Sequence, residues 1–128
     1  MSEYEQRAND FARKYGVKLS VLDKEYRPYF PGERDERWCY KCRISRNGKS
    51  YTFWFGQSIA SGDKRPTFYD IFSCFEKYDP GDFYEFCSEF GYSDESRSAE
   101  RIWKACCKEY AAVERLFGDV MEEFVKFC

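Results

Sequence analysis

Cys39 and Cys42 are the first residues of this sequence whose type and spacing suggest chemistry. The segment Cys39-Tyr40-Lys41-Cys42 has the spacing of half a zinc site or of a redox pair. Residues three apart in an extended strand point to opposite faces, and no second pair of this spacing exists in the chain. We therefore expect the seven cysteines to be reduced structural thiols, and we predict no metal site and no cofactor.

The chain contains no histidine, which excludes several classes of enzyme. Ser-His-Asp catalysis, Cys-His catalysis and His-ligated zinc all need an imidazole. Acid–base catalysis would then fall to paired carboxylates, and the only candidates are Asp79 with Asp82 and Asp94 with Glu95. Their spacing does not mark a metal-dependent nuclease. We predict that the protein is not an enzyme, and we assign no catalytic residue.

Acidic side chains concentrate in the second half of the chain. Residues 1–67 hold 14 Lys and Arg against 9 Asp and Glu, whereas residues 68–128 hold 7 against 14. A row of like charges can imitate the phosphates of nucleic acid or engage a basic groove on a protein. The structural alternative is a solvated helix face with acidic caps. The candidate partner-binding residues are Asp82, Glu85, Glu89, Asp94 and Glu95.

Basic side chains and one aromatic ring form a second candidate site, mostly in the first half of the chain. A ring beside cations can hold single-stranded nucleic acid without sequence preference. The structural alternative is a solvated sheet face on which Lys41 lies over Trp54. The candidate nucleic-acid-binding residues are Arg37, Lys41, Arg43, Arg46, Trp54, Lys64 and Arg65.

A predicted β-hairpin positions most of these basic residues. Alternating runs flank Asn47-Gly48, which is the preferred pair for a two-residue type I′ turn. Counting outward from this turn pairs Tyr40 with Phe55 on an apolar face. The same register puts Lys41 opposite Trp54 on the other face, so that Trp54 is the ring expected among the charges.

The other elements follow from capping signals and hydrophobic periodicity. We expect a helix over 1–16, an antiparallel sheet over 17–57 whose first strand covers 17–21, a loop over 58–66 and a helical part over 67–128. The helical part begins at Thr67 with a helix that ends near Tyr78. Asp79 is expected to cap a second helix with Phe90 on its apolar stripe, followed by a long helix that ends at Gly118 and a short last helix.

These elements define one fold class and one domain. We predict a single α+β domain over 1–128, with an N-terminal helix, an antiparallel sheet of about three strands that contains the Asn-Gly hairpin, and a C-terminal bundle of three to four helices. The Phe-rich last segment is apolar on more than one side and leaves a homodimer open. No run approaches the roughly 20 apolar residues of a membrane span, and the N-terminus lacks the apolar core of a signal peptide.

From Tyr51 onward the sequence resembles a family of small proteins encoded by tailed phages and prophages. The shared elements span about half of the chain. They are the YTF-x-FGQSI strand and loop, the P-T-x-Y-D helix start, the KYDPG-x-F linker and the EFGY-S-D-E-SR segment before the long helix. Cys39 and Cys42 fall outside this pattern. The family carries no assigned activity.

The resemblance implies a setting in the cytoplasm of a bacterial host cell. Small accessory phage proteins are often inhibitors that act by binding CRISPR nucleases or restriction enzymes, and we expect this function by analogy. The partner would be a host defence protein or nuclease complex, bound through the five acidic candidates. The alternative is a nucleic-acid-binding accessory protein of phage replication or recombination that uses the basic hairpin face.

Overall fold

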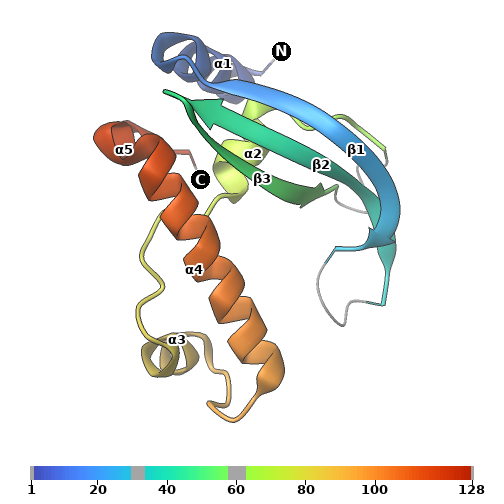
Figure 1. The fold of residues 1–128 in the computed structure, drawn as a ribbon, viewed down its shortest axis with the longest axis vertical. Coiled ribbons are helices and arrows are strands. Elements are labelled where there is room, and N and C mark those ends of the chain that lie inside the picture. The colour runs from blue at the N-terminus through green and yellow to red at the C-terminus, as the bar shows by residue number, and fades with distance from the viewer. Residues whose placement is uncertain (1, 30–33, 58–62, 128) are drawn as a thin grey trace. The chain divides into compact units, whose positions relative to one another are not determined.

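The computed structural model describes residues 2–29, 34–57 and 63–127 and has an α+β fold (Figure 1). The predicted fold class, with an N-terminal helix, a three-stranded antiparallel sheet and C-terminal helices, is confirmed. Part of the predicted loop over 58–66 lies outside the described residues. The elements are α1 (Glu3–Tyr15), β1 (Lys18–Pro28), β2 (Glu36–Arg46), β3 (Lys49–Gly56), α2 (Phe68–Cys74), α3 (Phe83–Phe90), α4 (Arg97–Phe117), a 3₁₀ helix (Gly118–Val120) and α5 (Met121–Phe124).

The sheet has the order β1-β2-β3, and both strand pairs are antiparallel. Asn47 and Gly48 have φ values of 52° and 74°, as a type I′ turn requires. The register between β2 and β3 is the expected one, with Tyr40 opposite Phe55 and Lys41 opposite Trp54. The two-residue turn therefore determines that Tyr40 and Phe55 lie on one face of the sheet and Lys41 and Trp54 on the other.

Strand β1 is longer than predicted. The alternation of apolar residues ends at Val21, but the strand continues to Pro28, which pairs with Glu36. A bulge between Val21 and Asp23 shifts the register, so the alternation breaks while the ladder continues. The prediction that the strand ends near residue 21 was wrong for this reason.

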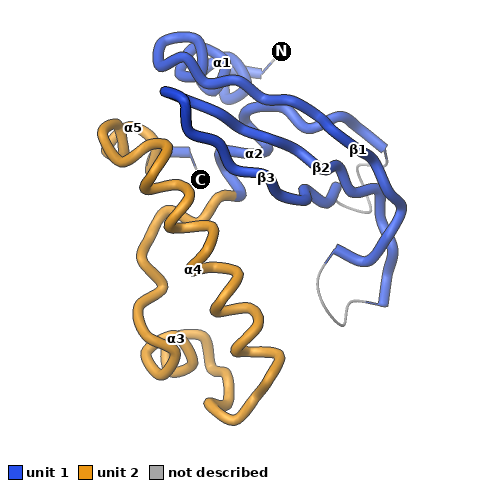
Figure 2. The backbone as a smooth tube through the Cα atoms, in the orientation of Figure 1, with its two compact units in different colours: residues 1–74, 127–128 blue, residues 75–126 orange. Residues whose placement is uncertain are grey.

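The chain divides into two compact units, residues 1–74 with 127–128 and residues 75–126 (Figure 2). The first unit contains the sheet, α1 and α2. Phe72 is fully buried in it, and its ring centroid lies 5.5 Å from Phe11, 5.5 Å from Phe68 and 5.4 Å from Phe127. The Phe11–Phe72 pair is edge-to-face and the other two pairs are tilted, so this aromatic cluster is a main part of the core of the first unit.

Helix α2 is shorter than predicted, although its start is as expected. Thr67 and Asp70 form a reciprocal capping box, because each side chain accepts a hydrogen bond from the backbone N–H of the other. The helix ends at Cys74 rather than near Tyr78. In the second unit, the buried Lys77 ammonium donates to the Phe75 carbonyl at 3.0 Å and satisfies an acceptor that a longer helix would have used.

The second unit contains α3, α4 and α5. Phe117 and Phe124 are fully buried, and their rings stack with centroids 4.2 Å apart. None of the helices that the structure describes is long and apolar enough to span a membrane.

A half-buried carboxylate in the second unit makes its stability depend on pH. Glu109 accepts a hydrogen bond from the Glu76 backbone N–H at 3.0 Å. Burial raises the pKa of Glu109 above its ordinary value of 4.5, and the Glu76 carboxylate adds to the rise, while that N–H and Lys77 oppose it. A carboxyl group whose pKa is raised by folding stabilises the fold most below pH 4.5. This contribution is lost as the pH rises through the raised pKa.

We expect Glu109→Gln to increase stability at pH 7 more than at pH 4. The amide keeps an oxygen for the Glu76 N–H and has no charge to bury. Thermal unfolding at the two pH values measures the difference. Glu100→Gln is the matched control, because Glu100 is an exposed glutamate on the same helix and forms only a surface ion pair with Lys104. Equal shifts at pH 4 and pH 7 would show that the Glu109 charge is not the cause.

Candidate functional site

Helix α3 carries most of the predicted partner-binding residues, and capping fixes both of its ends. Asp82 is the N-cap, and its Oδ1 accepts from the Glu85 backbone N–H at 2.8 Å. Gly91, with φ of 74°, ends the helix in the left-handed conformation. The predicted cap at Asp79 was wrong, because the Asp79 carboxylate accepts instead from the Gly81 N–H in the preceding turn.

The start of α3 is attached to α4 by Trp103. The indole Nε1 donates to the Gly81 carbonyl at 3.0 Å, and the Trp103 ring centroid lies 5.6 Å from that of Phe83. On the inner face of α3, Phe86 and Cys87 are buried. Helix α3 is therefore held on α4 by a hydrogen bond, an aromatic contact and its apolar face.

All five acidic candidates are exposed on this part of the second unit. No ion pair joins any of them to a described residue, and no Lys or Arg occurs between Lys77 and Arg97. Burial raises the pKa of the Cys87 thiol, and Asp94 lies close enough to raise it further. Within the described residues, the five carboxylates are therefore exposed negative charges that no ion pair neutralises.

Three aromatic rings in the same stretch of the chain, residues 82–95, are also exposed. Their exposed fractions are 70% for Tyr84, 59% for Phe90 and 42% for Tyr92. Phe90 was predicted to lie on the apolar stripe of α3, where packing would account for its ring, but more than half of the side chain is exposed. Its ring contacts Phe86 at 4.9 Å, but it belongs to the last turn of the helix, where the apolar stripe extends beyond the residues that cover it. We call the five carboxylates and these three rings the acidic-aromatic surface.

The sequence contained a signal for Phe90 that periodicity alone did not use. Phe90 directly precedes Gly91, so it belongs to the final turn, in which an apolar side chain has no further turn of its own helix beside it. Tyr84 and Tyr92 carried no comparable signal, because tyrosine is common both in cores and on surfaces.

The basic candidates do not form one surface. Arg37, Lys41 and Arg43 share the face of β2 that Trp54 occupies on β3. Arg65 lines a groove with Leu19 and Val21 in the first unit, and its charge acts on Cys42, which lies on the opposite face of β2 from Lys41.

Arg46 is buried, with 7% of its surface exposed. Its Nε donates to the Tyr15 carbonyl at 3.0 Å, and its guanidinium lies 5.5 Å from the centroid of the Tyr15 ring. The side chain thereby attaches the C-terminal end of α1 to the hairpin. The prediction that Arg46 contributes to a nucleic-acid-binding face was wrong, because the hydrogen-bonding groups of this side chain are used inside the fold.

Trp54 lies among charges, as expected, but a different cation covers it. The Arg27 guanidinium lies 4.9 Å from the centroid of the Trp54 ring, and Arg27 also approaches Glu25 at 3.9 Å. Arg27 comes from β1, which was predicted to end before it. A nucleic-acid base could stack on this face of Trp54 only by displacing Arg27.

Three of the described cysteines, Cys39, Cys42 and Cys87, are buried free thiols. Cys39 and Cys42 are both fully buried. The Cys39 Sγ lies 3.6 Å from the Arg27 carbonyl oxygen, whereas the Cys42 Sγ lies 3.6 Å from the Tyr40 carbonyl oxygen. Burial raises the pKa of Cys42 and of Cys106 to about 11, so both are protonated at neutral pH. Within the described ranges no cluster of Cys, Asp and Glu could hold a metal ion.

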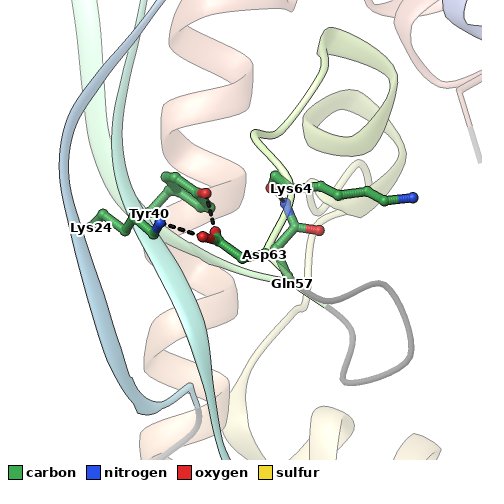
Figure 3. Close-up of polar contacts among 5 residues, drawn as sticks. All are labelled: Lys24, Tyr40, Gln57, Asp63 and Lys64. Atoms are coloured by element: carbon green, nitrogen blue, oxygen red, sulfur yellow. Dashed lines mark hydrogen bonds and ion pairs between the residues drawn. The ribbon is translucent and has the colours of Figure 1, made fainter.

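A polar network that the sequence did not indicate attaches the segment after β3 to the sheet. Asp63 accepts hydrogen bonds from the Lys24 ammonium and the Tyr40 hydroxyl, while the Lys64 side chain points away from them (Figure 3). Gln57 Nε2 donates to the Lys64 carbonyl. The hydrogen bonds from Lys24 and Tyr40 lower the pKa of Asp63, so this network is retained at neutral pH and weakens as the pH falls through that pKa.

Comparisons of the chain with protein-family models, with curated proteins and with solved structures gave no match.

Proposed function

We propose that the protein is a phage-encoded inhibitor, without enzymatic activity, of a bacterial defence nuclease, and that it binds this partner through the acidic-aromatic surface. The observation that supports this most is that residues 82–95, on and directly after a helix capped at both ends, expose five carboxylates, none in an ion pair with a described residue, and three aromatic rings. The resemblance to phage proteins supplies the setting.

The carboxylates suit a partner surface that normally binds nucleic acid. Such a surface carries Lys and Arg, and negative charges steer a protein to it and set the orientation of binding. At physiological salt, charges interact over about 8 Å, so unpaired carboxylates on adjacent turns act together on an approaching cation. Electrostatic attraction of this kind governs the rate of association and the choice of partner.

The three exposed rings can contribute buried apolar area to the interface, which the carboxylates cannot. Tyrosine and phenylalanine bury large areas on binding and lose few rotatable bonds, and aromatic residues are enriched among the side chains that dominate binding energy. More than half of the Phe90 side chain is exposed to water in the free protein, so this area remains to be buried by a partner. The combination of rings and carboxylates therefore supports a protein partner.

The test is capture of the host partner with tagged protein from a nuclease-treated bacterial lysate, followed by binding measurements with charge-reversed variants. The variant Glu85→Lys, Glu89→Lys and Asp94→Lys leaves the Asp82 cap intact. The control variant Asp35→Lys, Glu36→Lys and Glu122→Lys makes the same change in net charge at exposed positions elsewhere.

We expect the first variant to lose at least about tenfold in affinity for the captured nuclease, because like charges then face each other across the interface. The control variant should bind within about twofold of the original protein. Circular dichroism checks that both variants fold. Full inhibition of the nuclease by the folded first variant would refute the proposal.

A further inference from the structure

A groove in the first unit lies along β1, one of the two edge strands of the sheet. Its volume is about 630 Å³, and it is lined by Glu5 and Asn9 of α1, Leu19–Val21 of β1 and the segment Arg65–Phe68. Strand β1 is an edge strand, because it pairs only with β2 in the part of the chain that the structure describes (Figure 1). Side chains of successive strand residues point to opposite faces, so a groove that contacts three consecutive residues lies beside the backbone.

The hairpin register shows which backbone groups face this groove. Arg46 and Lys49 close the two-residue turn as a hydrogen-bonded pair, and such pairs alternate along an antiparallel ladder. Even-numbered residues of β2 therefore bond to β3, and odd-numbered residues bond to β1. The hydrogen bond from the Gln57 N–H to the Trp38 carbonyl, at 3.1 Å, agrees with this assignment.

The assignment places the polar groups of Leu19 and Val21 on the outer edge of β1. Leu19 pairs with Ile44 and Val21 with Cys42, and both partners are even-numbered residues whose backbone bonds go to β3. The N–H and C=O groups of Leu19 and Val21 therefore point away from β2 and toward the groove. Neither residue makes a backbone hydrogen bond outside the β1–β2 ladder to any described residue.

We infer that this groove binds an extended peptide segment of a protein partner, which adds to the outer edge of β1 at Leu19–Val21. The backbone groups of the segment would complete the four hydrogen bonds that Leu19 and Val21 offer. The charges in the groove set the side chains that fit. Arg65 is exposed and Glu5 half-buried, and neither forms an ion pair with a described residue, so the segment carries one acidic and one basic side chain.

The bulge in β1 favours a short peptide of another protein over a second copy of this chain. It disrupts the regular edge between Val21 and Asp23, so a regular outer edge extends only from the start of the strand to Val21. Two copies that paired edge to edge would need a longer, flatter strand, and bulges are a common means by which proteins prevent such pairing.

A fluorescent peptide selected from a random nine-residue library against the whole protein is the probe, and two variants test the two parts of the site. Val21→Pro removes an outward N–H and no N–H of the β1–β2 ladder. Arg65→Glu reverses the groove charge, and Lys64→Glu is its matched control, because Lys64 is the exposed neighbour and does not line the groove. The charge-reversed variant of the acidic-aromatic surface should bind the peptide normally.

We expect selected peptides to contain both an acidic and a basic residue. Their affinity should fall about tenfold or more with Val21→Pro and with Arg65→Glu, and by less than about twofold with Lys64→Glu. If Val21→Pro does not fold, the Arg65→Glu and Lys64→Glu pair decides the matter. The inference is overturned if no peptide is selected or if Arg65→Glu and Lys64→Glu have the same effect. It is also overturned if the protein is a dimer that Arg65→Glu or folded Val21→Pro dissociates.

Discussion

Phe90→Ala is expected to weaken binding to the captured defence nuclease by about thirtyfold or more, because it removes the largest wholly apolar side chain of the acidic-aromatic surface. Phe90 is 59% exposed, so the free protein gains little from its ring and should keep its stability. Titration calorimetry or surface plasmon resonance with the purified partner measures the change.

Tyr26→Ala is the matched control for Phe90→Ala. Tyr26 is an aromatic residue of the first unit with a similar exposed fraction, 55%, and it lies outside the acidic-aromatic surface. Its removal should leave the affinity for the nuclease unchanged. Equal losses for the two variants would mean that the decrease is not specific to this surface, and an unchanged affinity of Phe90→Ala would exclude the ring from the interface.

Phe72→Ala should have the opposite profile, with a large effect on stability. The side chain is fully buried and contacts three other rings in the first unit, and truncating such a phenylalanine costs about 3–5 kcal/mol. This is a large part of the total stability of a small domain. Urea unfolding followed by circular dichroism measures the loss.

Phe90→Ala serves as the control for Phe72→Ala in the unfolding experiment, because it is the same substitution at an exposed site. We expect it to change the free energy of unfolding by less than about 1 kcal/mol. The two phenylalanines would thereby be separated into one that stabilises the fold and one that is available to a partner. If Phe72→Ala unfolded cooperatively at the same urea concentration as the unmodified protein, Phe72 would not be a stabilising residue of the core.

The hairpin could be predicted from the sequence because its information is local. Asn47-Gly48 strongly favours the type I′ turn, and a two-residue turn determines the register of the pairs that follow it. The capping box of Thr67 and Asp70 was predictable for the same reason. Asp79 and Asp82, three residues apart, could each have capped α3, and the sequence pattern of caps did not decide between them.

The unexpected burial of Arg46, the exposure of Phe90 and the unexpected cation over Trp54 have a common cause. Whether a side chain is exposed depends on segments distant in the sequence, such as Tyr15 for Arg46 and Arg27 for Trp54. Periodicity identifies the face on which a residue lies but not what covers that face. The five acidic candidates were placed correctly on the surface because charged residues are rarely buried without a partner.

The hydrogen bond between Trp103 and the Gly81 carbonyl makes this tryptophan a natural fluorescent reporter. Trp38 and Trp54 belong to the first unit, so Trp103 is the single tryptophan of the second. A protein in which Trp38 and Trp54 are replaced by phenylalanine would therefore emit only from the contact that holds α3 on α4. The emission of that one indole would follow the release of α3 in solution, without any added label.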